Sequence, residues 1–111
     1  MPLEIIRRNG YQQQDRAEVE EAVAKAVEEN ADYFIEKYTS DERSFGGRYV
    51  AADLFKETFS QFSESKEARN RYNGPVHNSA AVLSAEQFRR VLAEKTHPER
   101  DTVVFLTGIP N

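Results

Sequence analysis

The chain has 111 residues, of which 31% are charged and 39% hydrophobic, and a formal net charge of −4. This size and balance predict one compact soluble domain with a modest core. Cysteine is absent, which excludes disulfides, thiolate metal ligands and cysteine nucleophiles. No apolar run approaches the roughly 20 residues that span a bilayer, and the N-terminus is too acidic for a signal peptide. We expect a cytoplasmic protein without a membrane partner, although a periplasmic one fits the same composition.

Charge is distributed unevenly along the chain. Residues 15–42 hold ten acidic and three basic residues, a local balance of −7, whereas residues 43–100 hold seven acidic and ten basic ones, a balance of +3. Neither part forms a dense basic stripe, so no nucleic-acid partner is expected. Two interpretations stay open: two solvated helix surfaces, or an acidic segment lying over a basic phosphate-handling site of the same molecule.

Residues 1–14 have no clear hydrophobic period and are predicted as an irregular, exposed lead-in. Asp15 and Glu18 match a capping box that opens a helix. Apolar residues then recur at helical spacing, which predicts a helix of about six turns over residues 15–38. The stripe consists of Val19, Val23, Val27, Ala31, Phe34 and Tyr38.

Residues 39–47 are predicted as a connection, because Ser-Asp and Gly-Gly pairs interrupt helices. A second amphipathic helix is predicted over residues 49–62. Its high phenylalanine content favours a packing surface over a ligand pocket.

Two more helices are predicted in the second half of the chain. The first is a short helix capped within residues 63–65; it ends at Tyr72, since Gly74 permits the positive φ of a C-cap and the next residue is proline. The second covers residues 76–95, with a kink or restart at Ser84.

The last segment differs in kind. After a polar loop, residues 102–107 form a β-branched, nearly continuous apolar run, which predicts a strand buried on both faces, as in a parallel sheet. The expected fold is mainly α: a bundle of three to five helices in a domain of residues 15–97, followed by one strand within residues 98–111. Without a visible sheet partner, this strand is expected to be disordered or to pair with a second copy in a homodimer.

A hydrophobic strand that enters a glycine-containing turn is how a P-loop begins. The full signature is a glycine, four residues, and then Gly-Lys-Ser/Thr, whose backbone N–H groups and lysine hold phosphates. Gly108 fits the first glycine, and Ile109, Pro110 and Asn111 fit the next three positions. These four residues are the candidate nucleotide-binding residues, as a partial P-loop.

Two segments carry a family resemblance. Residues 68–83 read ARNRYNGPVHNSAAVL and are followed by EQFRR at 86–90, and residues 101–110 read DTVVFLTGIP. Both resemble bacterial zeta-toxin family kinases, in the same order and at a matching separation, so the resemblance covers roughly residues 48–111.

The resemblance implies a P-loop kinase that phosphorylates UDP-N-acetylglucosamine with ATP and magnesium. The family's P-loop lysine, acidic residue and arginines follow the P-loop and are not among these 111 residues, so this chain alone is expected to lack activity and cofactors. The implied partner is the remainder of the kinase domain or a cognate antitoxin.

The other groups of residues that could bind a ligand or catalyse a reaction give weak signals. His77 and His97 lack the spacing of a metal site, and Ser79 near His77 lacks the acid of a catalytic triad. Asp53 and Glu57 share a helix face, where carboxylates are usually solvated. Four arginines are candidate phosphate contacts, with ordinary surface positions as the favoured alternative. They are Arg69, Arg71, Arg89 and Arg90.

A different class of function is an antitoxin-like autoinhibitory or interaction module, because zeta toxins are inhibited by a three-helix antitoxin. In this interpretation the acidic helix competes with nucleotide, and its outward charges are Glu20, Glu21, Glu28 and Glu29. A third alternative is a standalone product of a truncated gene without activity.

Overall fold

A computed structural model describes residues 3–94 and 104–106. The elements run in the order α1 (Gln14–Thr39), the 3₁₀ helix η1 (Glu42–Ser44), β1 (Tyr49–Ala51), α2 (Ala52–Lys56), α3 (Ser60–Ser63), α4 (Lys66–Tyr72), α5 (His77–Ala93) and β2 (Val104–Leu106). The fold is mainly helical, as predicted, with five α-helices in the described residues.

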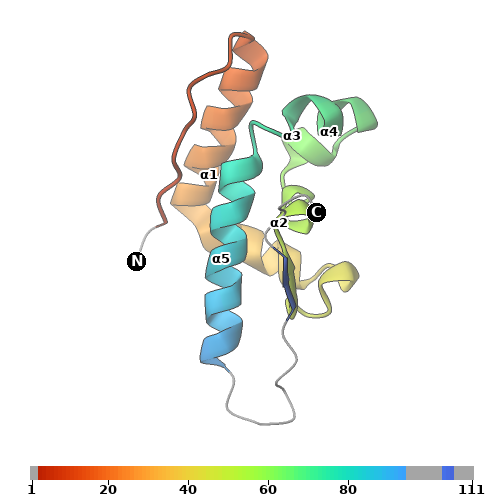
Figure 1. Ribbon diagram of the computed structural model, residues 1–111. Coiled ribbons are helices and arrows are strands. Elements are labelled where there is room, and N and C mark those ends of the chain that lie inside the picture. The colour runs from red at the N-terminus through yellow and green to blue at the C-terminus, as the bar shows by residue number, and fades with distance from the viewer. Residues whose placement is uncertain (1–2, 95–103, 107–111) are drawn as a thin grey trace.

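The two long helices, α1 and α5, lie side by side and form the body of the molecule (Figure 1). The lead-in runs along α1, and α2 packs against α5. The core between them combines aliphatic and aromatic side chains from α1, the 50–62 segment and α5. Its largest fully buried members include Val23, Val27, Tyr38, Phe55, Phe59 and Leu83.

Helix α1 confirms the predicted apolar stripe, since Val23, Val27 and Tyr38 are fully buried. The predicted capping box of Asp15 and Glu18 is wrong. The N-cap is Gln13, which makes no side-chain capping bond. Asp15 instead binds residues of α4. The helix is also interrupted at Asn30, whose φ of −152° and ψ of 56° are not helical.

The predicted helix over residues 49–62 is wrong at its start and in its continuity. Tyr49–Ala51 is a strand, preceded by Gly46 and Gly47 at positive φ. A turn then separates α2 from α3, where the Thr58 hydroxyl donates to Phe55 O at 2.6 Å. This side-chain bond offers the backbone an alternative to the helical ladder.

The remaining helices follow the predictions more closely. Ser65 caps α4 by accepting from the N–H of Ala68 at 2.9 Å. Gly74 does not have positive φ; a Cβ there would lie 2.7 Å from the Tyr11 hydroxyl, so a side chain at this position would displace the end of Tyr11. Helix α5 continues through Ser84, whose buried hydroxyl donates to Ala81 O, and the predicted restart is absent.

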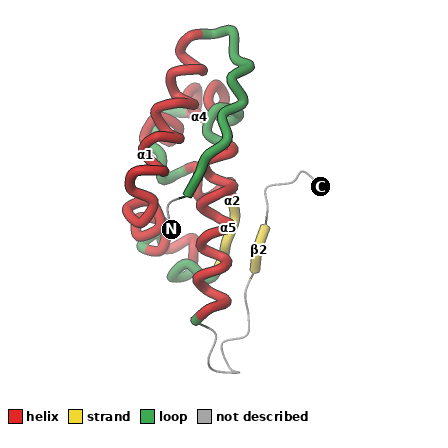
Figure 2. The backbone as a smooth tube through the Cα atoms, turned by 90° about the vertical axis from the view of Figure 1, so that its left-hand side faces the viewer, coloured by secondary structure: helices red, strands yellow, loops and turns green. Residues whose placement is uncertain are grey.

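The predicted C-terminal strand is present, as β2, but it is not unpaired. It lies parallel to β1, with Tyr49 opposite Val104, Val50 opposite Phe105 and Ala51 opposite Leu106. In the described part of the chain the sheet has these two strands. Figure 2 shows β2 on the outer side of the molecule, away from α1.

Candidate functional site

The carboxyl end of the β1–β2 pair is the candidate functional site, because the predicted phosphate loop follows β2 in sequence. Both strands run in the same direction, so their carboxyl ends meet at one edge of the sheet. Helix α2 begins at this edge, directly after β1. In open α/β sheets, ligands bind beyond the carboxyl ends of parallel strands.

Tyr38 fixes β1 in place from the side opposite β2. Its hydroxyl donates to Tyr49 O and accepts from the N–H of Ala51 at 3.1 Å. The ring stacks on Phe55 at a centroid distance of 3.7 Å and is fully buried. Burial raises the pKa of Tyr38 to about 12, so the hydroxyl keeps its proton and its donor role. The sequence pattern identified Tyr38 only as an apolar position.

Lys56, the last residue of α2, is a buried cation. Its Nζ lies 2.7 Å from Asn73 Oδ1 and 3.6 Å from Asp53 Oδ1, and its side chain is 4% exposed. Burial lowers the pKa of Lys56 below its ordinary value, and Asp53 partly offsets this effect. Nothing in the hydrophobic pattern indicated Lys56.

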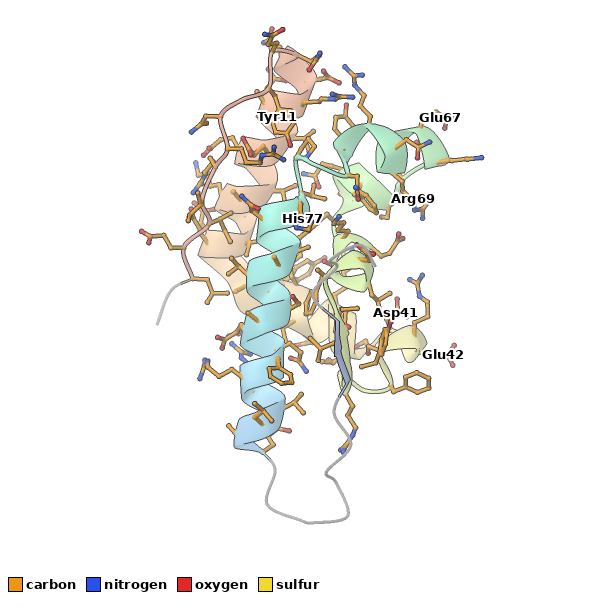
Figure 3. The ribbon with its side chains drawn as sticks, in the orientation of Figure 1. Tyr11, Asp41, Glu42, Glu67, Arg69 and His77 are labelled. Carbon is orange, nitrogen blue, oxygen red and sulfur yellow. The ribbon has the colours of Figure 1, made fainter. Side chains whose placement is uncertain are left out.

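His77 lies at the start of α5, near the middle of the molecule (Figure 3). Burial, and next the charge of Lys56, lowers the pKa of His77, which favours the neutral imidazole. Ser79 is buried. In the described residues no group of three or more His, Cys, Asp or Glu side chains could hold a metal ion.

The four candidate arginines are not brought together. Arg69 pairs with Glu57 at 3.0 Å, and Arg71 pairs with Asp15, which also accepts from the Tyr72 hydroxyl. These bonds lower the pKa of Asp15 well below its ordinary range, chiefly through Arg71.

On α5, Arg89 and Arg90 both bind Glu86, and Arg90 also reaches Asp32 of α1 at 2.7 Å. Arg69, Arg71 and Arg90 therefore pair with carboxylates of other segments of this chain, and Arg89 pairs within α5. Asp53 and Glu57 do not form a carboxylate pair, because Asp53 pairs with Lys56 and Glu57 pairs with Arg69.

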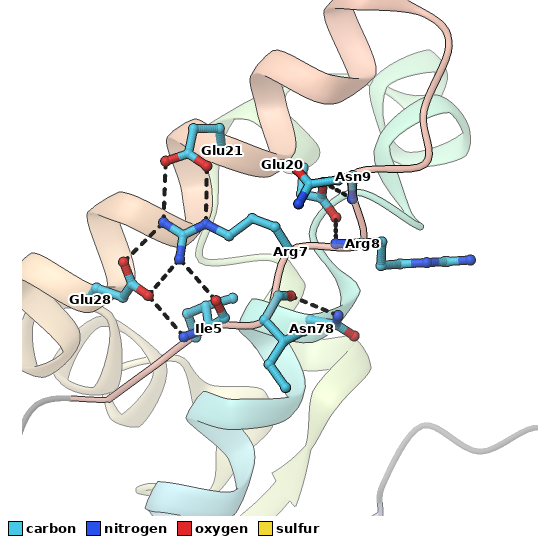
Figure 4. A network of polar contacts seen from close by, with 9 residues as sticks. Ile5, Arg7, Arg8, Asn9, Glu20, Glu21, Glu28 and Asn78 are labelled. Carbon is cyan, nitrogen blue, oxygen red and sulfur yellow. Dashed lines mark hydrogen bonds and ion pairs between the residues drawn. The ribbon is translucent and has the colours of Figure 1, made fainter.

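Three of the eight carboxylates of α1 bind the lead-in: Glu20, Glu21 and Glu28 (Figure 4). Arg7 binds Glu21 at 3.0 Å and Glu28 at 2.6 Å, and Glu28 also accepts from the N–H of Ile5. Arg7 is the main cause of the lowered pKa of Glu28.

Glu20 is 5% exposed and accepts from the backbone N–H groups of Arg8 and Asn9. Its prediction as an outward charge is therefore wrong, and Glu28 is also partly buried. Glu21 and Glu29 are exposed as predicted.

Two hollows on the surface lie away from the sheet edge. The larger, about 510 Å³, lies between the ends of α1 and α5 and the 46–48 turn. The smaller, about 260 Å³, lies between the interruption at Asn30, Leu3 and α5.

The predicted P-loop residues Gly108, Ile109, Pro110 and Asn111, and also His97, lie outside the described residues. None of the described helices combines the length and the apolarity needed to cross a membrane. A scan against protein-family models gives no match to this chain, and a search of curated proteins gives none.

Proposed function

We propose that this chain is the N-terminal helical part of a zeta-toxin-like P-loop kinase, which phosphorylates UDP-N-acetylglucosamine with ATP. The observation that carries the proposal is the parallel pairing of β2 with β1. Parallel strands are characteristic of α/β domains, and β2 directly precedes the Gly108 sequence that opens a P-loop. The family resemblance of residues 68–90 and 101–110 supports the same conclusion.

In this proposal the described residues position the phosphate loop and do not themselves react. Tyr38 and α5 fix β1, and β1 fixes the strand that leads into Gly108. Gly108, Ile109, Pro110 and Asn111 would supply the first part of the loop that holds the ATP phosphates. The P-loop lysine and the magnesium-binding hydroxyl belong to the Gly-Lys-Ser/Thr sequence, which is not among these 111 residues. This chain alone is therefore catalytically incomplete, and the kinase acts in the cytoplasm.

The inhibitory alternative has less support in the described residues. Glu20, Glu21 and Glu28 already bind residues 5–9 of the same chain. An acidic surface that is engaged in this way has fewer charges left to compete with a nucleotide.

The proposal is tested by comparing residues 1–111 with a longer polypeptide that includes the sequence encoded directly downstream. We expect the downstream sequence to read Gly-Lys-Ser/Thr within a few residues. The longer polypeptide should transfer phosphate from ATP to UDP-N-acetylglucosamine, followed by ³¹P NMR. Residues 1–111 should show no transfer and no binding of magnesium-ATP in calorimetry.

A pair of variants sharpens this test. Gly108→Val should abolish transfer by the longer polypeptide, because a side chain there obstructs the turn around the phosphates. Ile6→Ser, at a side chain that is 76% exposed, should leave transfer unchanged. A downstream sequence without the lysine motif, or full activity of Gly108→Val, would rule the proposal out.

A further inference from the structure

The start of helix α5 lacks the groups that usually offset the positive end of a helix. Its N-cap is Val76, which makes no side-chain capping bond, and the first turn of this described helix holds no acidic residue. The first turn begins instead with His77. The backbone N–H groups at a helix N-terminus carry partial positive charge, which favours a neutral imidazole there over an imidazolium. Protonation of His77 is therefore unfavourable at this position.

Two other segments bring positive charge to the same place. The Nζ of Lys56 lies 2.7 Å from Asn73 Oδ1, in the turn that leads into α5, and the charge of Arg8 in the lead-in acts on His77 in the same direction. Asp53 supplies the opposing negative charge, but its side chain is 77% exposed, whereas that of Lys56 is 4% exposed. Water screens the exposed charge more than the buried one. Burial is the main cause of the lowered pKa of His77, followed by the charge of Lys56.

The start of α5 also joins three segments of the chain. Helix α2 packs against α5, and the bond from Lys56 to Asn73 ties the end of α2 to the turn before α5. The side-chain amide of Asn78 donates to the C=O of Ile6 at 2.9 Å, which ties the lead-in to the first turn of α5. A charge on His77 thus acts where α2 and the lead-in both attach to α5.

We propose that the start of α5 is an acid-sensitive junction, at which protonation of His77 loosens α2 and the lead-in from α5. The imidazolium meets Lys56 and Arg8 as like charges at the positive end of the helix. Histidine changes its charge near pH 6.5, whereas glutamates do so near pH 4.3, so mild acid acts on this junction before it acts on the carboxylates of α1. The proposal does not depend on the proposed function, because every group of the junction belongs to the described residues.

The stability of the 111-residue chain should depend on pH in a defined direction. Because folding lowers the pKa of His77, the unfolded chain binds this proton more tightly. The stabilisation is complete above the ordinary histidine pKa of about 6.5 and is lost as the pH falls below it. The melting temperature should fall between about pH 7.5 and pH 5, and His77→Gln, which stays neutral, should flatten this fall. Equal slopes in the two proteins would overturn the proposal.

Proton NMR follows the two histidines of the chain, His77 and His97, separately. Lys56→Met should raise the pKa of His77 and Asp53→Asn should lower it, because the two charges act in opposite directions. Lys66→Met, at an exposed position of α4, is the matched control for the loss of a lysine and should leave the pKa unchanged. A His77 that titrates at the ordinary value, or that responds to neither change, would contradict the proposal. If Lys56→Met does not fold, Asp53→Asn at its exposed position decides the question alone.

Amide hydrogen exchange shows whether the opening is local. The N–H of Val76 donates to Tyr72 O, and the N–H of Ala80 donates to Val76 O, both at 3.1 Å, so these two amides report on the junction. Their protection factors should fall by at least about threefold from about pH 7 to pH 5.5, and that of Val27, fully buried in α1, should change less. An equal fall at all three positions would indicate global destabilisation and would contradict a junction that opens by itself.

Discussion

The lead-in and β2 are both extended segments laid along a mainly helical body, but they are attached in opposite ways. Residues 5–9 are bound through side chains: Arg7 reaches two glutamates of α1, and Glu20 of α1 reaches back to two backbone N–H groups. β2 is bound through its backbone, in register with β1. Attachment of the lead-in therefore depends on individual ionisable residues, whereas attachment of β2 depends on the correct placement of β1.

The largest expected effect comes from the residue that places β1. Tyr38→Phe keeps the ring stacked on Phe55 but leaves the C=O of Tyr49 and the N–H of Ala51 without their partner. A buried N–H and a partly buried C=O left unpaired should cost about 2–4 kcal/mol in the free energy of unfolding, measured in urea. Tyr33→Phe, at a side chain 54% exposed, is the control and should change little. A loss as small as that of the control would mean that Tyr38 does not hold β1.

A smaller effect is expected at the carboxylate that holds the lead-in. Glu20→Gln retains one acceptor oxygen, so one of the two bonds to the N–H groups of Arg8 and Asn9 is lost. This should lower the free energy of unfolding by about 1–2 kcal/mol. The matched change Glu29→Gln, at an exposed position of the same helix, should be neutral. Equal effects of the two changes would show that the lead-in is not bound through Glu20.

Acid should weaken the lead-in before it affects β2. The pKa of Glu28 is lowered in the folded chain by Arg7, so the unfolded chain takes up this proton at a higher pH. The stabilisation is therefore complete above the ordinary glutamate pKa of about 4.3 and is lost as the pH falls below it. The melting temperature should fall over this range, and the fall should be shallower in Arg7→Met. An identical pH profile of that variant would contradict the role of Arg7.

The smallest expected effect is a gain of stability in the turn before β1. Phe45 has a φ of 51° and is 73% exposed. Left-handed backbone raises the energy of a residue that has a side chain, and the exposed ring gains little from burial to offset this. Phe45→Gly should raise the free energy of unfolding by about 0.5–1 kcal/mol, after the entropy cost of glycine. Phe45→Ala keeps the Cβ and serves as the control. A loss of stability in the glycine variant would show that the ring, not the backbone, supports the turn.

Much of the fold was predictable because helical periodicity is a local signal. The stripe of α1, the Ser65 cap and the apolar run of β2 were each identified from residues close together in sequence. β1 was not, because its strand conformation depends on Tyr38, eleven residues earlier in the chain, and on β2. Tyr49, Val50 and Ala51 precede a phenylalanine-rich stretch. In so short an apolar run, the hydrophobic pattern does not distinguish a strand from the start of a helix.

The side-chain roles were harder to predict than the elements. Glu20 belongs to a run of glutamates, and only the path of the lead-in distinguishes it from Glu29. The positive φ that the sequence predicts at Gly74 is absent, and its one close neighbour is the hydroxyl of Tyr11, 63 positions away in sequence. The phosphate-loop assignment at Gly108 stays a prediction from sequence.

The interruption of α1 at Asn30 has a mechanical consequence. A continuous helix of 26 residues would act as one rigid lever. Asn30 divides it into two arms, one carrying the glutamates that hold the lead-in and the other carrying Tyr38. The two attachments therefore lie on different arms of α1, and the lead-in and β1 are not held by the same uninterrupted ladder of helical hydrogen bonds.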